Sequence, residues 1–169
     1  MERKIVAFSG AHGTGKTTAV YRMAANLKLE QTGSVGVILE TARICPFPVL
    51  SATCDKPSQD AQMWIFTRQI QEEMQASRIY DVVVSDRTVL DSIAYTAAAG
   101  MNDLAYAMRE VARHYAPIAY QSVYFRSLVD CDYCVNDGFR NQDVEFRRDV
   151  EWALLDLYDE MGIEVKHGY

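Results

Sequence analysis

The feature that most constrains the fold of this chain is a glycine-rich segment near its start. Residues 10–17 read Gly-Ala-His-Gly-Thr-Gly-Lys-Thr, between an apolar run at 5–9 and a helical stripe that ends before Gly33. In this setting the glycines let successive backbone N–H groups turn toward phosphate oxygens, with the helix N-terminus behind them. The segment therefore predicts a loop that binds a nucleoside triphosphate, made of Gly10, Ala11, His12, Gly13, Thr14, Gly15, Lys16, Thr17 and Thr18.

Two side chains of this loop have the chemistry that phosphoryl transfer requires. Lys16 is expected to reach the terminal phosphates, and the Thr17 hydroxyl is expected to ligate a magnesium ion that screens their charge. ATP and Mg²⁺ are therefore the expected cofactors. The same loop serves kinases, ATPases and switches, so the reaction has to be inferred from the rest of the chain.

Apolar runs alternate with helical patterns along the whole chain, which is typical of an α/β domain with a parallel sheet. A length of 169 residues without repeats or low-complexity linkers fits a single domain spanning 1–169. We expect strands at 5–9, 35–39, 82–85, 122–125 and 163–165. The expected helical stripes are Met63, Phe66, Ile70 and Met74; Leu104, Met108, Val111 and Tyr115; and Phe146, Val150, Leu154, Leu157 and Met161.

Charged residues follow two of the expected strands at the point where each strand ends. Ligands of parallel sheets bind beyond the carboxyl ends of the strands, so these residues are site candidates. Glu40 is the candidate general base, Asp86 a candidate magnesium ligand, and Arg87 a candidate partner for phosphate oxygens. Two structural alternatives stay open: Asp86 caps the following helix, and Glu40 forms an ion pair with Arg43.

These residues carry a resemblance to a known family. The phosphate loop, Glu40-Thr-Ala-Arg43, Asp86-Arg87 and Asn136-Asp-Gly-Phe-Arg140 together resemble ribosylnicotinamide-kinase-like and AAA-type P-loop ATP-binding domains. More distantly the chain is similar to deoxynucleoside and thymidylate kinases. The resemblance covers nearly the whole chain and implies a three-layer domain, with a five-stranded parallel sheet in order 2-3-1-4-5, helices on both faces, and a lid at about 127–141.

The resemblance also implies roles for individual residues. Glu40 would be the base, Asp86 and Arg87 would serve metal and phosphate, and Arg140 of the lid would clamp the transferred group. Gln62 and Met63 resemble a ribosylnicotinamide kinase segment, whereas the adjoining Trp64 does not. The expected acceptor pocket is lined by Glu40, Arg43, Gln62, Trp64 and Arg87.

These observations favour a magnesium-dependent kinase that passes the terminal phosphoryl group of ATP to a hydroxyl or phosphate of a nucleoside- or nucleotide-like small molecule. One alternative is a nucleotide-gated regulatory domain with slow ATPase activity, and another is a kinase that acts on a modified base in DNA. Seventeen Lys and Arg against 23 Asp and Glu give a net charge of -6, which disfavours nucleic acid as a partner.

Several other features favour ordinary structural interpretations. The sequence shows no signal peptide and no run of ~20 apolar residues, so we expect a cytoplasmic protein without a membrane partner, and a homodimer stays open. Cys131 and Cys134 have the spacing of two zinc ligands, but no second tight pair accompanies them, and free thiols are expected. Arg147 and Arg148 are assigned to a solvated face, with phosphate contact as the alternative. Trp64 and Phe66 are assigned to the core, with base stacking as the alternative.

Overall fold

The expected sheet is confirmed in the computed structural model, which describes residues 5–49, 58–130 and 144–169. Five parallel strands pair in the order β2-β3-β1-β4-β5. The strands are β1 Ile5–Ser9, β2 Val35–Ile38, β3 Val82–Asp86, β4 Tyr120–Phe125 and β5 Val165–Lys166. The helices are α1 Lys16–Leu29, the 3₁₀ helix η1 Thr41–Ile44, α2 Gln59–Ile79, α3 Val89–Ala98, α4 Asn102–Ala119 and α5 Val144–Glu160.

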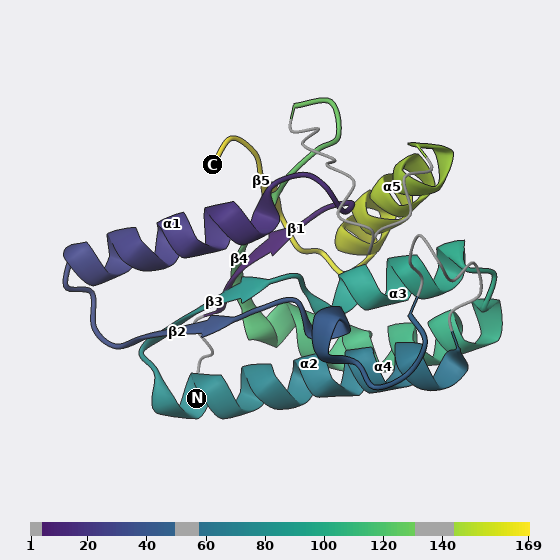
Figure 1. The fold of residues 1–169 in the computed structure, drawn as a ribbon, viewed down its shortest axis with the longest axis horizontal. Coiled ribbons are helices and arrows are strands. Elements are labelled where there is room, and N and C mark those ends of the chain that lie inside the picture. Colours follow the sequence, from purple (N-terminus) through teal and green to yellow (C-terminus); the bar gives the residue numbers. More distant parts are fainter. Residues whose placement is uncertain (1–4, 50–57, 131–143) are drawn as a thin grey trace.

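Helices cover both faces of the sheet, as Figure 1 shows, with α1 on one side and α2 and α4 on the other. The alternation of side chains along each strand supplies the two cores. Phe8 and Val84 pack with Val20 of α1, whereas Ile5 and Val83 belong to the larger cluster with the remaining helices. The three-layer architecture therefore follows from strands that are apolar on both faces.

The core-facing side of α2 differs from the expected apolar stripe. Phe66 is buried, but Met63 and Met74 are both 45% exposed. The buried face instead includes Gln69 and Glu73, which lie among hydrogen-bond partners under the sheet. The periodicity argument was wrong here because it counts only apolar residues, whereas a polar side chain with partners is also buried without large cost.

Smaller differences concern element ends and the surface. The last strand is Val165–Lys166 rather than 163–165, and Val111 of the α4 stripe is 50% exposed. Most of the expected lid at 127–141 lies outside the described residues. None of the described helices has both the length and the apolar character needed to cross a bilayer.

The backbone of the phosphate loop starts at a glycine that no other residue replaces easily. Gly10 has φ +131°, and a Cβ atom on it would lie 2.3 Å from the carbonyl oxygen of Arg126, just after β4. This close approach lets the loop leave β1 directly against the end of β4. The sequence motif thus requires Gly10 for backbone geometry as well as for phosphate access.

We predict that Gly10→Ala lowers the free energy of unfolding by about 3 kcal/mol, because it adds a clash to an unfavourable φ. Gly100→Ala is the matched control: Gly100 also has positive φ, but nothing lies within 4 Å of its added Cβ. The control should cost about 1 kcal/mol. Urea unfolding followed by circular dichroism measures both, and equal losses would contradict the role of the Arg126 contact.

Candidate functional site

Lys16, at the start of α1, folds back onto the loop that precedes it. Its Nζ donates to the carbonyl oxygen of Ala11 at 2.5 Å and to Oγ1 of Thr14 at 3.3 Å, and the residue is 5% exposed. Burial, together with the nearby charge of Arg87, lowers the pKa of Lys16 from 10.5 to about 7, although carboxylates including Asp86 oppose the shift. The ammonium group therefore lies in a place where an added anion would stabilise its charged form.

The crest of the phosphate loop, which is the backbone of His12 and Thr14, forms hydrogen bonds with side chains from α3, α5 and the segment after β4. The His12 N–H donates to the Tyr95 hydroxyl of α3 at 2.8 Å, and Arg147 Nε of α5 donates to the His12 carbonyl oxygen at 3.2 Å. Arg126, after β4, donates from Nε to the carbonyl oxygen of Thr14 at 2.8 Å. The solvated-face interpretation was therefore wrong for Arg147, which is 3% exposed, whereas Arg148 is exposed.

Thr17 and Asp86 bring two oxygen ligands together at the mouth of the loop. Thr17 Oγ1 donates to Asp86 Oδ2 at 2.5 Å, and Asp86 is 1% exposed. Burial raises the pKa of Asp86, while the charges of Lys16 and Arg87 oppose this shift. Among the described residues no cluster of three His, Cys, Asp or Glu forms a complete protein cage for a metal. A threonine hydroxyl and one carboxylate instead fit magnesium, which completes its shell with phosphate oxygens and water.

Asp86 does not cap the next helix, so that alternative is wrong. Thr88 is the N-cap residue of α3, and both its N–H and its hydroxyl donate to Asp91 Oδ2 at 2.9 Å. Asp86 is the last residue of β3 and is left to face the phosphate loop. Because Asp91 makes the capping interaction of α3, the Asp86 carboxylate is available to the pocket.

Arg87 is clamped between two carboxylates and an aromatic ring. Its Nε and Nη2 donate to Glu40 Oε1 at 2.9 and 2.7 Å, and its Nη1 donates to Asp91 Oδ1 at 3.2 Å. The guanidinium carbon lies 5.0 Å from the centre of the Tyr95 ring. Burial alone would lower the pKa of Arg87, but the Glu40 charge and the other partners hold it well above its ordinary value. The side chain is therefore a fixed positive charge.

Glu40 receives a second arginine on its other oxygen. Arg43 Nε donates to Glu40 Oε2 at 3.0 Å, which confirms the ion pair considered from sequence. The Glu40 side chain is 7% exposed, whereas Arg43 is 47% exposed. Two guanidinium groups thus meet on one carboxylate at the carboxyl end of the sheet.

These groups line a single pocket of about 320 Å³. The structure therefore brings residues of the loop, the magnesium candidates and the three charged residues predicted to line the acceptor pocket together. The lining residues are Gly13, Gly15, Lys16, Thr17, Thr18, Glu40, Arg43, Asp86 and Arg87.

Gly10, Ala11, His12 and Thr14 of the loop are not among that lining, and neither are Gln62 and Trp64 of the expected acceptor pocket. Gln62 is buried and its Oε1 accepts from the Thr96 hydroxyl at 3.1 Å, and Trp64 is half-buried on α2. Their substrate-binding role stays a prediction. Arg140 lies outside the described residues, as do Cys131 and Cys134. Phe66 is 3% exposed in the core cluster, so the core interpretation is confirmed for it.

Two residues that hold Arg87 of this pocket, Asp91 and Tyr95, were not predicted from the sequence. A signal for them existed in the sequence. Asp91 and Tyr95 are four residues apart, which places them on one face of α3, and Asp91 lies four residues after Arg87. Thr88 and Asp91 also have the spacing of a capping box.

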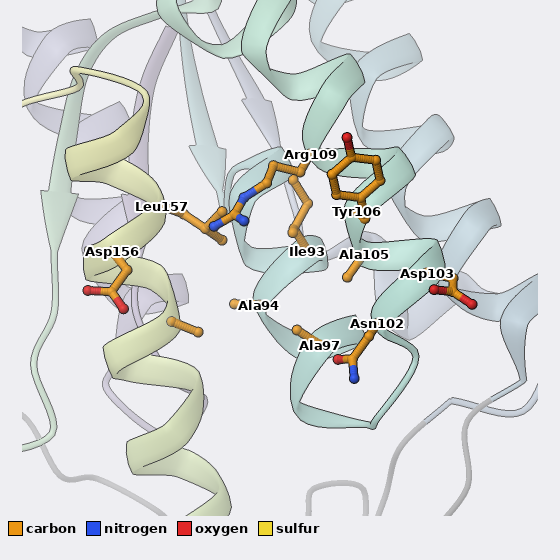
Figure 2. Close-up of a pocket in the computed structure, with 11 residues that line it drawn as sticks. Ile93, Ala94, Ala97, Asn102, Asp103, Ala105, Tyr106, Arg109, Asp156 and Leu157 are labelled. Carbon is orange, nitrogen blue, oxygen red and sulfur yellow. The ribbon is translucent and has the colours of Figure 1, made fainter.

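A second pocket lies apart from the phosphate loop, between α3, α4 and α5 (Figure 2). It measures about 510 Å³, and small side chains such as Ala94 and Ala97 form much of its lining. Arg109 extends from α4 toward Leu157 of α5. Arg109 pairs with Glu160 at 2.6 Å, and the same carboxylate also pairs with Arg113.

Comparison with known proteins identifies the family. The family described as AAA domain matches residues 5–167, and the chain belongs to it. No curated protein sequence matches the chain.

Two solved thymidylate kinases share the fold. The enzyme from Ehrlichia chaffeensis superposes with a TM-score of 0.63 at 15% identity, over 100% of this chain and 90% of that chain. The enzyme from Candida albicans superposes with a TM-score of 0.67 at 14% identity, over 98% of this chain and 84% of that chain. At this identity the similarity shows a common P-loop fold.

The lowered pKa of Lys16 predicts a characteristic pH dependence of stability. Between pH 7 and 10.5 the unfolded chain holds a proton on Lys16 that the folded chain has lost, so folding is favoured increasingly as pH rises. Lys16→Met removes this contribution, which has a slope of up to about 1.4 kcal/mol per pH unit. The variant should therefore be more stable than the parent below pH 7, and the difference should shrink toward pH 10.

Urea unfolding at several pH values measures this difference. Lys28→Met is the control, because Lys28 is exposed in the last turn of α1. Its difference from the parent should be small and independent of pH. A Lys16→Met difference that does not change between pH 6 and 10 would contradict the buried, uncompensated ammonium group.

Proposed function

We propose that this member of the AAA domain family is a magnesium-dependent phosphotransferase that moves the terminal phosphoryl group of ATP to a nucleoside monophosphate. The observation that carries the proposal is the composition of the 320 Å³ pocket. One side holds a phosphate loop with Lys16 and Thr17, and the other holds two arginines that meet on Glu40. A donor site and an anion-selective acceptor site thus share one space.

The donor side is suited to the terminal phosphates of ATP. Lys16 is now bonded to uncharged oxygens, so an incoming phosphate offers its ammonium group a better partner. Magnesium held by Thr17 and Asp86 would neutralise charge on the transferred group. The backbone groups around Gly13 and Gly15, which line the same pocket, lie where the phosphate oxygens are cradled.

The acceptor side favours an acceptor that carries a negative charge. Arg87 and Arg43 already bind a carboxylate from two sides, and guanidinium groups bind phosphate oxygens by the same planar geometry. An acceptor phosphate would bring an ionised oxygen to attack the terminal phosphorus of ATP. The bond from that phosphorus to the bridging oxygen of ADP breaks as the new bond forms. Thymidylate kinases share the fold, so thymidine monophosphate is the first probe.

An ionised acceptor oxygen changes the role of Glu40. A nucleoside hydroxyl must lose a proton when it attacks, and Glu40 would then be the general base predicted from sequence. A phosphate oxygen has no proton to lose, and Glu40 then acts by holding Arg43 and Arg87 in place. A hydroxyl acceptor therefore requires Glu40 to take up a proton, whereas a phosphate acceptor requires it only to hold the two arginines.

We predict that ADP release in the presence of Mg-ATP rises with nucleoside monophosphates rather than with nucleosides or ribosides. Glu40→Gln should then lower turnover by about 10-fold or less, because the amide oxygen of glutamine still accepts hydrogen bonds from the arginines and no needed base is removed. Glu72→Gln is the control, because Glu72 forms an ion pair with Arg68 at 2.8 Å on the surface of α2.

Two outcomes would contradict this proposal. Activity with nucleosides alone, lost by ~100-fold or more in Glu40→Gln, would make Glu40 the base and a hydroxyl the acceptor. If no acceptor raises ADP release above the rate with water, the kinase proposal fails and a slow ATPase switch replaces it.

Asp86→Asn should raise the magnesium concentration that gives half-maximal ADP release, by about 10-fold or more, since a neutral amide is a poorer partner for a hard cation. Asp103→Asn is the control, because Asp103 is exposed on α4, away from the phosphate loop. Turnover measured against magnesium concentration tests this. A curve unchanged from the parent would remove Asp86 from the metal site.

A further inference from the structure

Tyr95 contacts both halves of the pocket, although it is not part of the pocket lining. Its hydroxyl oxygen accepts the His12 N–H at 2.8 Å and lies 2.9 Å from Nδ1 of the same residue. Its ring lies under the Arg87 guanidinium group, 5.0 Å from the guanidinium carbon. One rigid side chain thus joins the crest of the phosphate loop to the acceptor-side arginine.

We propose that Tyr95 is a positioning residue that couples nucleotide binding to acceptor binding. The coupling half of this inference rests on the proposed function, whereas the contact with His12 concerns the nucleotide alone. Tyr95 acts through His12 on one side and through Arg87 on the other. A shift of the loop toward bound phosphates moves the tyrosine ring, and the ring in turn limits where the guanidinium group lies.

The contact with the loop is suited to this role because it fixes a peptide unit. His12 is held at its N–H by Tyr95 and at its carbonyl oxygen by Arg147 of α5. The loop crest therefore cannot rotate without losing a hydrogen bond to one of two helices. A tyrosine side chain has only two torsions, so fixing it between His12 and Arg87 costs little conformational entropy.

The contact with Arg87 is the other half of the link. Arg87 has φ +89° at the end of β3, an uncommon backbone state for a residue with a side chain. Glu40 and Asp91 hold the edge of the guanidinium group, and the Tyr95 ring supports its face. A cation over an aromatic ring is stabilised by ~0.5 to 2 kcal/mol, so removing the ring takes away the contact on the face of the guanidinium group and leaves those with Glu40 and Asp91.

Tyr95→Phe and Tyr95→Leu separate the two contacts. Phenylalanine keeps the ring under Arg87 and loses the hydroxyl, whereas leucine loses both. The first readout is the dissociation constant of magnesium with a non-hydrolysable ATP analogue, measured by isothermal titration calorimetry without any acceptor. We expect Tyr95→Phe to weaken binding by about 5-fold, as for the loss of one hydrogen bond.

Tyr115→Phe controls for the loss of a buried hydroxyl as such. The Tyr115 hydroxyl donates to Glu73 Oε2 at 2.7 Å, between α4 and α2 in the buried core. This variant should lose thermal stability but bind the analogue like the parent. If Tyr95→Phe also binds like the parent, the contact with His12 positions nothing and the proposal is overturned.

The second readout is the coupling itself, taken as the ratio of thymidine monophosphate affinities with and without the saturating ATP analogue. Coupling is reciprocal, so either ligand reports it. The parent should show a ratio of about 5-fold or more, Tyr95→Phe a ratio closer to one, and Tyr95→Leu also weaker binding of thymidine monophosphate alone. An unchanged ratio in both variants would contradict the link. A parent that binds no nucleoside monophosphate would refute the proposed acceptor and with it the coupling, while the first readout still decides whether Tyr95 positions the loop.

Discussion

The interaction on which the rest of this site depends is the buried ion pair of Arg87 with Glu40. Taking two charges out of water costs several kcal/mol for each ion, so such a pair persists only where its geometry is well satisfied. Here Glu40 comes from the end of β2, Arg87 from the end of β3, and Asp91 from α3. Satisfying the one guanidinium group therefore fixes two strand ends and a helix relative to each other.

Lys16 differs from Arg87 in that no carboxylate accepts a hydrogen bond from it among the contacts described above. It is as deeply buried as Glu40, yet its hydrogen bonds go to the Ala11 carbonyl oxygen and the Thr14 hydroxyl rather than to a carboxylate. The result is a pKa lowered to about 7 by burial. The protein thus places one charge that is already balanced beside one that is not. An anion at Lys16 would gain a partner whose charge is not yet balanced, which favours the phosphates of the nucleotide at the loop.

The sequence predicted the parts of this arrangement that have local or periodic signals. The phosphate loop has fixed spacing, and parallel strands must bring Glu40 and Asp86 to one edge, so the fold class and most of the pocket followed, whereas the strand order came from the family resemblance. The polar face of α2 was missed because Gln69 and Glu73 are buried through partners distant in sequence, such as Tyr115 and Tyr120. Arg147 was missed for the same reason, since its partner is a loop carbonyl oxygen 135 residues away.

The buried network beneath Arg87 limits which parts of the site can move. Gln69 Nε2 donates to Glu73 Oε1 at 2.8 Å, to Ser85 Oγ at 2.9 Å and to the Arg87 carbonyl oxygen at 3.4 Å. Any displacement of the Arg87 backbone would leave buried polar groups unsatisfied, at a cost of about 1–3 kcal/mol for each group. Arg43 has no comparable constraint from burial, because its side chain is 47% exposed. If the acceptor is a nucleoside monophosphate, as proposed, its phosphate would meet one arginine whose backbone is held by this network and another whose side chain is more exposed.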